Sequence, residues 1–258
     1  MLLDEMIANK RREVEAAKAR LPLEELRGRV ARYQASRAFR EAIAVPGTLS
    51  LIAELKRKSP SKGMLRERFD PVSLAQTLAE AGAAALSVLT DEAYFGGHLD
   101  FLRDAKQFTE VPVLRKDFII DPYQVFEAAL YEADAVLLIA RVLPEPSLAE
   151  CLQAAEALAI DPLVEVHSAD EVRIASRVGA RLLGINHRDL GTFQMDPDLT
   201  ERLLPMAPAG SVIVAESGIQ TAEDVARMKR LGVHAILVGE ALMVAPDPAA
   251  KLRELLAR

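Results

Sequence analysis

Two oppositely charged side chains stand at the end of an apolar run near residue 50. Residues 50–55 read Ser-Leu-Ile-Ala-Glu-Leu, and Lys56 follows, so Glu54 and Lys56 lie where a buried strand would open into a loop. A buried carboxylate or ammonium is costly unless it pairs or meets a charged ligand. The loop 57–63 adds further cations and two serines, which suit an anionic group such as phosphate. A solvated basic turn and an anion site both explain this stretch alone.

Polar side chains of the same kind follow several other apolar runs. Charged or amide residues lie within or directly after four of these runs, 111–114, 162–166, 181–185 and 211–215. Acids and ammonium groups that converge can move protons, as general acid–base catalysis requires. Packing alone does not explain so many charges at the ends of apolar runs. These residues are Arg115, Lys116, Asp117, Glu165, Asn186, Arg188, Asp189 and Glu216.

Glycine-containing turns follow the last two apolar runs. Ser217-Gly218 follows run 211–215, and Gly239-Glu240 follows run 235–238. Backbone N–H groups in such turns can hold a phosphate at the end of a barrel. The Glu240 carboxylate would repel phosphate, so only its backbone N–H is expected to help. Each glycine taken alone is more often a plain turn, whereas the pair at two successive strand ends favours an anion site.

Apolar residues near the same strand ends predict a wall for an organic ligand. Phe95 and Phe118 lie in loops, Leu137 lies within a run, and Leu190 lies just beyond one. A hydrophobic lid packed over a barrel explains these residues equally well.

Eight short apolar runs must position these side chains. They suit parallel strands that are buried on both faces. Helix start signals separate them, with Asp70-Pro71 and Asp121-Pro122 as caps and Ser168–Glu171 as a capping box. Segments 168–186 and 221–239 repeat the same order of cap, helix, break and strand. The eight runs are 50–55, 85–89, 111–114, 135–139, 162–166, 181–185, 211–215 and 235–238.

The repeated helix–strand units predict an α/β protein with a (β/α)8 TIM barrel. An open doubly wound sheet is the alternative, but no Gly-x-Gly-x-x-Gly motif follows any run. Residues 1–48 have apolar residues at helical spacing, and no long linker separates them from the first strand. We therefore expect one barrel domain over residues 1–258, with residues 1–48 as an N-terminal helical extension packed on it.

Bulk composition restricts the partners. The net charge is −6, no long basic tract occurs, and tryptophan is absent, which disfavours nucleic-acid binding. No run approaches the roughly 18 apolar residues of a membrane span. Cys151 is the only cysteine, so a disulfide framework is excluded and a reducing cytoplasm is expected. The acidic balance and the charged helix faces favour a monomer.

Four of these segments together resemble the indole-3-glycerol phosphate synthase family. They are Ile-Ala-Glu-Leu-Lys-Arg-Lys-Ser-Pro-Ser at 52–61, Leu-Arg-Lys-Asp-Phe at 114–118, Gly-Ile-Asn-His-Arg-Asp-Leu at 184–190 and Ala-Glu-Ser-Gly at 215–218. The resemblance runs from the N-terminal extension to the end of the chain. It implies conversion of 1-(2-carboxyphenylamino)-1-deoxyribulose 5-phosphate to indole-3-glycerol phosphate, CO2 and water, with no cofactor and no metal.

The resemblance also implies roles for the charged residues. Lys116 would donate a proton to the ketone oxygen during ring closure, and Glu165 with Lys56 or Glu54 would serve the later dehydration. Asn186, Arg188 and Glu216 would orient the substrate polyol and carboxylate. The resemblance also implies that Asn186 is one of the catalytic residues. The remaining substrate contacts would come from Ser59, Pro60, Phe95, Phe118, Leu137, Leu190, Ser217, Gly218, Gly239 and Glu240.

Several alternatives stay open. Another phosphate-binding barrel enzyme, such as a sugar-phosphate isomerase, would share the glycine turns. A Schiff-base aldolase would use Lys116 or Lys56 as a nucleophile, and a non-catalytic phosphate-binding barrel would not need the buried acids. The family often has a small residue where this chain has His187, to which we assign no role. The other histidines, His98, His167 and His234, are expected to be structural or solvated, since none has a paired metal ligand.

Overall fold

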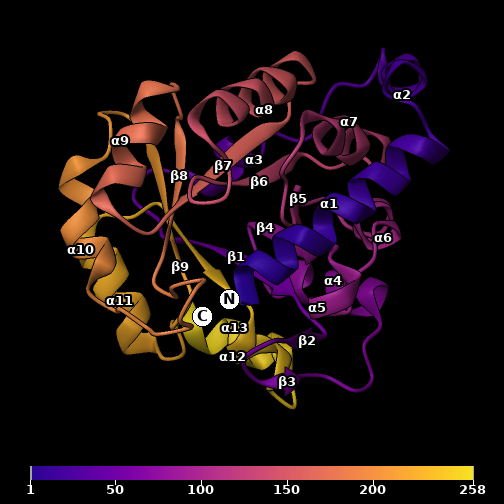
Figure 1. The fold of residues 1–258 in the computed structure, drawn as a ribbon. Helices are drawn as coiled ribbons and strands as arrows, with labels where there is room; N and C mark the ends of the chain where they lie inside the picture. The colour runs from indigo at the N-terminus through magenta and orange to yellow at the C-terminus, as the bar shows by residue number, and fades with distance from the viewer. Residues whose placement is uncertain (1, 258) are drawn as a thin grey trace.

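A closed barrel of eight parallel strands forms the centre of the computed structural model, which describes residues 2–257 (Figure 1). Each strand pairs with its sequence neighbours among the eight, and β1 closes the barrel against β10. The predicted (β/α)8 barrel is therefore confirmed. The strands are β1 (Ser50–Leu55), β4 (Ala85–Leu89), β5 (Val113–Lys116), β6 (Ala135–Ile139), β7 (Asp161–Val166), β8 (Leu182–Asn186), β9 (Val212–Glu216) and β10 (Ala235–Val238).

The third barrel strand differs from the predicted run 111–114. It begins at Val113 and extends to Lys116, because Lys116 still pairs with Leu89 of β4. Pro112 precedes the strand and lacks a backbone N–H, although its carbonyl accepts a hydrogen bond from Leu86. The ladder thus places Lys116 within the strand rather than in the following loop.

Helices surround the strands, as Figure 1 shows. The predicted caps Asp70 and Asp121 are confirmed, since each accepts hydrogen bonds from backbone N–H groups of the first helical turn. Ser168 also caps its helix, but the predicted capping box is not formed there, because the Glu171 carboxylate accepts from the backbone N–H of His167 instead. The reciprocal capping box is found at Thr221 and Asp224. The outer helices are α4 (Pro71–Glu80), α6 (Asp100–Phe108), α7 (Pro122–Leu130), α8 (Glu145–Ala157), α9 (Ala169–Arg177), α11 (Ala222–Leu231) and α13 (Pro248–Leu255). Shorter ones are α5 (Glu92–Phe95), α10 (Leu199–Leu203) with the 3-10 turn Leu204–Met206, and α12 (Glu240–Met243).

The core has two layers. One lies between helices and strands, and the other fills the barrel interior with alternate residues of the strands, including Ile52, Leu114, Leu163 and Val214. Burying each such side chain stabilises the fold by roughly 1.5–3 kcal/mol. The filled interior leaves the strand ends as the place where polar side chains can gather.

Three helices precede β1: α1 (Leu2–Arg20), α2 (Leu23–Val30) and α3 (Phe39–Ile43). Helix α3 closes the N-terminal end of the barrel, because Phe39 and Ile43 are fully buried in the interior cluster. Helix α1 reaches the opposite end, where Lys10 meets the loops that follow β4 and β5. The helical character predicted for residues 1–48 is thus observed; residue 1 lies outside the described residues, as does residue 258.

The loop after β1 is more ordered than the predicted loop 57–63. Lys58–Ser59 (β2) pairs antiparallel with Gly63–Met64 (β3) to form a small hairpin. Gly63 has a φ of +70°, which the turn requires and which other residues rarely adopt. The hairpin places Ser59 beside the barrel mouth.

Candidate active site

A cavity of about 1060 Å³, including its open mouth, lies at the C-terminal end of the barrel. Every residue to which the resemblance assigned a catalytic or substrate-binding role lines it: Glu54, Lys56, Ser59, Pro60, Phe95, Lys116, Phe118, Leu137, Glu165, Asn186, Arg188, Leu190, Glu216, Ser217, Gly218, Gly239 and Glu240. Two other charged residues singled out in the sequence do not line it: Arg115 pairs with Asp117 and Glu127, and Asp189 pairs with Arg141. Further lining residues that sequence reasoning missed include Ile139, Phe193 and Leu237. Ile139 is the last residue of its apolar strand and Leu237 the last but one of its own, so strand alternation was the only signal for them.

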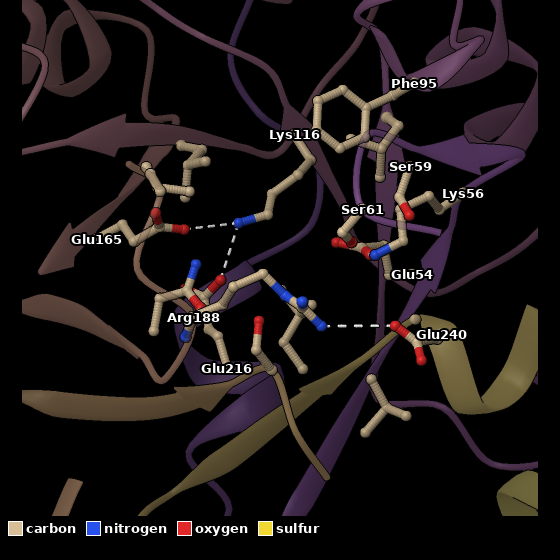
Figure 2. Close-up of a pocket in the computed structure, with 18 of the residues that line it drawn as sticks. Glu54, Lys56, Ser59, Ser61, Phe95, Lys116, Glu165, Arg188, Glu216 and Glu240 are labelled. Carbon is tan, nitrogen blue, oxygen red and sulfur yellow. Dashed lines mark hydrogen bonds and ion pairs between the residues drawn. The ribbon is translucent and has the colours of Figure 1, made fainter. Parts of the chain in front are cut away.

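Lys116 bridges two buried carboxylates at the bottom of this cavity. Its Nζ lies 2.8 Å from Oε2 of Glu165 and 2.8 Å from Oε2 of Glu216. The three side chains come from β5, β7 and β9, and Figure 2 shows the ammonium between the two acids. Both glutamates are 1% exposed, so a single cation balances two desolvated acids.

Because one ammonium faces two carboxylates, the pKa values of Lys116, Glu165 and Glu216 shift in different directions. Burial alone would lower the pKa of Lys116, but the carboxylates of Glu165, Glu216 and Glu54 outweigh it and raise that pKa. Burial raises the pKa of Glu216, and repulsion from Glu165 adds to the rise, while Lys116 opposes it. Burial would also raise the pKa of Glu165, but Lys116 and His167 outweigh burial and lower it. Of the two carboxyl groups, Glu216 is therefore the weaker acid and Glu165 the stronger one.

Asn186 orients the neighbouring groups. Its Oδ1 accepts a hydrogen bond from the backbone N–H of Arg188 at 3.0 Å, which directs the amide nitrogen away from that turn. The amide also contributes to lowering the pKa of Glu165, after the larger effects of burial and of Lys116. An amide in this position can hold both a carboxylate and a substrate hydroxyl.

Glu54 and Lys56 form a second acid–base pair on the other side of the cavity. Oε1 of Glu54 lies 2.5 Å from Nζ of Lys56, and Glu54 is buried while Lys56 is partly exposed. Figure 2 shows both side chains beside Ser59 and Ser61 of the hairpin. The sequence-predicted charges at the end of the first strand therefore pair with each other and face the cavity.

Two glycines leave room for the buried carboxylates. A Cβ on Gly184 of β8 would overlap Oε1 of Glu216, and a Cβ on Gly239 would overlap Oε1 of Glu54. No role was predicted for Gly184. Its signal was a glycine inside an apolar strand, which often marks a close approach of another group.

An apolar wall stands beside the charged groups. The rings of Phe95 and Phe118 lie 6.2 Å apart at a tilt of 50°. Leu137 and Leu190 also line the cavity. The arrangement gives a flat organic group an apolar surface next to the acid–base triad.

The rim after β9 and β10 carries the glycine turns. Ser217 and Gly218 have φ values of +65° and +76°, a left-handed pair that turns the backbone sharply at the cavity edge. The Glu240 side chain also enters the cavity, where Arg188 lies 3.5 Å and Lys62 3.9 Å from its carboxylate (Figure 2). Its charge is therefore balanced by two cations rather than facing the cavity alone.

The four histidines have different surroundings. His98 is half-exposed beside Glu92 and Asp100, and His234 accepts a hydrogen bond from the Ile213 backbone. His187 turns away from the cavity, with its ring nitrogens 3.0 Å from the Ser217 carbonyl and 2.7 Å from the Thr200 hydroxyl.

His167 is the exception, because it is buried directly behind Glu165. Sequence reasoning grouped it with the structural or solvated histidines. Its motif, Glu-Val-His, places His167 two residues after Glu165 and directly after the end of β7, and this alternate spacing was the available signal.

Among residues 2–257, no group of three or more His, Cys, Asp or Glu side chains could hold a metal ion. No helix of the same residues is long and apolar enough to cross a membrane.

The barrel and its buried lysine–carboxylate triad define an acid–base enzyme of the (β/α)8 class. The family model described as indole-3-glycerol phosphate synthase matches residues 3–255. The chain belongs to the indole-3-glycerol phosphate synthase family, whose members are carboxy-lyases of tryptophan biosynthesis. This confirms the resemblance that the four sequence motifs carried.

Curated relatives agree over their whole length. A protein from Roseiflexus castenholzii named indole-3-glycerol phosphate synthase is 46% identical over 262 residues, which cover 98% of this chain and 97% of the relative. A protein of the same name from Carboxydothermus hydrogenoformans is 45% identical over 265 residues and 100% of both chains.

More distant solved structures share the fold alone. A 3-hexulose-6-phosphate synthase from Salmonella typhimurium has a TM-score of 0.63 at 17% identity, over 81% of this chain and 97% of its own. Thiamine phosphate pyrophosphorylase from Pyrococcus furiosus has a TM-score of 0.60 at 21% identity, over 80% of this chain and 93% of its own.

Proposed function

We propose that this cavity converts 1-(2-carboxyphenylamino)-1-deoxyribulose 5-phosphate to indole-3-glycerol phosphate, CO2 and water, with Lys116 as the general acid. The activity follows from family membership, and the assignment of roles to residues is our proposal. The observation that carries it is the contact of Lys116 with Glu165 and Glu216 at 2.8 Å each. This contact keeps the lysine charged and gives it a proton to donate.

Ring closure is the first step. The aryl carbon that carries the carboxylate attacks the ketone carbon, so a C–C bond forms and the C=O π electrons move to oxygen. Lys116 donates a proton to that oxygen and offsets its developing charge. The apolar wall around Phe95 and Phe118 would hold the aryl ring against the ketone.

Loss of CO2 and of water completes the reaction. When the carboxylate leaves as CO2, its bonding electrons return to the ring and restore aromaticity. The new hydroxyl then leaves as water after receiving a second proton, while a base removes a proton from the neighbouring carbon. We propose Glu165 as this base, because its lowered pKa keeps it ionised, and the pair of Lys56 and Glu54 as the source of the second proton.

The rest of the site would bind the substrate. Backbone N–H groups of Ser217, Gly218 and Gly239 would receive the phosphate. Arg188, Glu216 and Asn186 would orient the polyol and carboxylate. Ser59, Pro60, Leu137, Leu190 and the backbone of Glu240 complete the proposed contacts.

We also propose that the enzyme acts as a cytoplasmic monomer that does not bind nucleic acid and needs no cofactor. The single cysteine supports a reducing compartment, since one thiol cannot form a disulfide within the chain. The acidic net charge of −6 supports the exclusion of nucleic acid. The proposed domain, residues 1–258, combines the barrel with its three N-terminal helices.

Indole fluorescence tests the proposed function. Mixing the protein with the carboxyphenylamino-deoxyribulose phosphate should produce an indole signal together with CO2, and its absence would remove the proposal. Borohydride added during turnover distinguishes the aldolase alternative, because a synthase of this kind forms no imine that reduction could trap. Family membership does not favour either the isomerase or the aldolase.

A further inference from the structure

His187 follows β8 directly, and its backbone is fixed on both sides. Its N–H donates to the carbonyl of Glu216, the last residue of β9, at 2.9 Å, and its carbonyl accepts from the backbone N–H of Asp196 at 2.8 Å. Asn186 pairs with Glu216 in the ladder of β8 and β9, so the residues that follow, His187 and Ser217, come together behind the cavity rim. His187 is 3% exposed and does not line the substrate cavity. It is therefore a buried support that the substrate does not touch.

Both ring nitrogens of His187 have a partner. Nδ1 lies 3.0 Å from the Ser217 carbonyl oxygen, and Nε2 lies 2.7 Å from the hydroxyl oxygen of Thr200 on α10. A carbonyl can only accept, so Nδ1 carries the hydrogen, and in a neutral ring Nε2 then accepts from the Thr200 hydroxyl. Burial lowers the pKa of His187 and favours this neutral ring, although the Ser217 carbonyl and Asp196 oppose the shift. The ring thus has one defined orientation and gives its single N–H to Ser217.

The Ser217 carbonyl shares a planar peptide unit with the Gly218 N–H. No cis peptide bond occurs within residues 2–257, so the C=O and the N–H of this unit point in opposite directions. His187 holds the carbonyl from outside the cavity, whereas Ser217 and Gly218 both line the cavity. The contact therefore directs the Gly218 N–H towards the cavity. A hydrogen bond at the carbonyl also polarises the peptide and strengthens its N–H as a donor.

The turn needs this support because its backbone conformation is unusual. Ser217 has a φ of +65°, a left-handed conformation that residues other than glycine rarely adopt. Gly218 follows at +76°, and a glycine lets the preceding peptide rotate at little steric cost. A sparsely populated conformation of this kind persists where the surrounding structure holds it. The Nδ1–H of His187 supplies such a hold at the Ser217 carbonyl.

We propose that His187 is a positioning residue of the phosphate site, because it holds the peptide between Ser217 and Gly218 so that the Gly218 N–H faces the substrate phosphate. The inference rests on the proposed function for the phosphate that this turn would bind. His187 itself does not touch the substrate, and no bond forms or breaks at its ring. Loss of the contact leaves the carbonyl without its donor and frees the peptide to rotate, which takes one N–H away from the anion.

His187→Leu and His187→Asn separate the hydrogen bond from the packing of the ring. Leucine fills a similar volume but has no donor, whereas the asparagine amide nitrogen can occupy the place of Nδ1 and donate to the Ser217 carbonyl. Both variants lose the contact with Thr200. The difference between them therefore isolates the bond to Ser217.

His187→Leu should raise KM by about ten-fold with kcat within about two-fold, because contacts to the phosphate act on substrate and transition state alike. The constant for competitive inhibition by inorganic phosphate should rise by the same factor. His187→Asn should keep both constants within about three-fold of the wild-type values. His234→Asn is the matched control for the loss of an imidazole, because its amide oxygen can still accept from the Ile213 N–H, and it should leave both constants unchanged.

Amide NMR gives a readout that does not need turnover. Added inorganic phosphate should shift the Gly218 N–H resonance downfield in the wild type and in His187→Asn, but not in His187→Leu. An equal shift in all three proteins, or no shift in the wild type, would overturn the positioning role. Equal KM values for the two variants, or a fall in kcat at unchanged KM, would overturn it as well. If His187→Leu does not fold, His187→Ala, which also lacks a donor, takes its place.

The two proposals fail in different ways. A wild-type protein that forms no indole product removes the proposed function, whereas a phosphate shift of Gly218 that depends on the donor at position 187 would still establish the positioning role. Indole formation with a normal KM in His187→Leu would remove the positioning role alone.

Discussion

Lys10 of α1 places its ammonium 2.8 Å from Oδ1 of Asp117, the residue that follows Lys116. The same ammonium lies 3.1 Å from Asp91, in the loop after β4. Burial would raise the pKa of Asp117, but Arg115 and Lys10 outweigh it and lower that pKa to about 2. The N-terminal helix therefore supplies a buried cation that joins two loops of the active site.

Lys10→Met should weaken both folding and catalysis. The change removes the buried cation that balances Asp91 and Asp117. Removing one partner of a buried ion pair costs about 3–5 kcal/mol of stability. The segment after Lys116 and the segment before helix α5, which carries Phe95, would lose a shared anchor, so kcat/KM should fall about ten-fold. Urea unfolding and steady-state kinetics measure the two effects.

Lys18→Met is the matched control, because Lys18 also joins α1 to the loop after β5, through Asp121 at 2.7 Å. Both partners are 31% exposed, so the loss should stay below about 1 kcal/mol, with unchanged kinetics. Equal behaviour of the two variants would contradict the anchoring role of Lys10.

Lys116→Ala should lower kcat by at least about 100-fold, since it removes the proposed general acid. The expected reason is loss of the proton for the ketone oxygen, so no change of pH should restore the rate. Lys251→Ala, on the outer helix α13, is the control for the loss of a lysine. Near-normal turnover by Lys116→Ala, measured by indole fluorescence, would remove Lys116 from its role.

Gly184→Ala should displace the Glu216 carboxylate. The new methyl group would overlap Oε1 and approach Cδ to 3.2 Å, and the barrel interior leaves little room for retreat. We expect kcat to fall at least about ten-fold.

Gly28→Ala is the matched control for Gly184→Ala, since nothing lies within 4 Å of the new Cβ and position 28 is inside helix α2. It should stabilise the fold by about 0.5–1 kcal/mol without affecting kinetics. An active Gly184→Ala enzyme would show that the glycine is not needed to place Glu216.

Glu216→Gln should stabilise the protein while impairing catalysis. Burial and Glu165 raise the pKa of Glu216, so the folded state binds a proton more tightly than the unfolded chain. Stability must then fall as pH rises from the ordinary carboxyl pKa towards the raised one. The variant should lose this dependence, with a gain on the order of 1–3 kcal/mol at about pH 8 and little gain at about pH 5. Equal gains at both values would contradict a raised pKa.

Glu240→Gln should tighten binding of the phosphorylated substrate. The carboxylate engages Arg188 and Lys62 at the rim, and its removal frees both cations and relieves repulsion of an anion. We expect KM to fall about two- to ten-fold at low salt, with less effect at high salt. Glu254→Gln, on the outer helix α13, controls for the net charge. An unchanged or higher KM would show that the ion pairs of Glu240 assist the site instead.

Sequence alone determined the architecture. The eight apolar runs matched the eight barrel strands, because strands buried on both faces need near-continuous apolar residues. It also placed the site residues, since the ends of parallel strands in a closed barrel must converge. The predicted bounds were two residues off at β5, where the ladder extends to Lys116, and one residue off at β7, β8 and β9.

Only the tertiary structure decided which charges meet. Lys116 joins Glu165 and Glu216, whereas Lys56 joins Glu54, and these partners depend on the barrel register rather than on spacing along the chain. The role of Gly184 and the position of His167 behind Glu165 had only weak signals in the sequence, because each depends on a contact that the folded chain makes. Sequence periodicity specifies which residues are buried, but the pKa of a buried group depends on distances across the barrel, which only the folded chain sets.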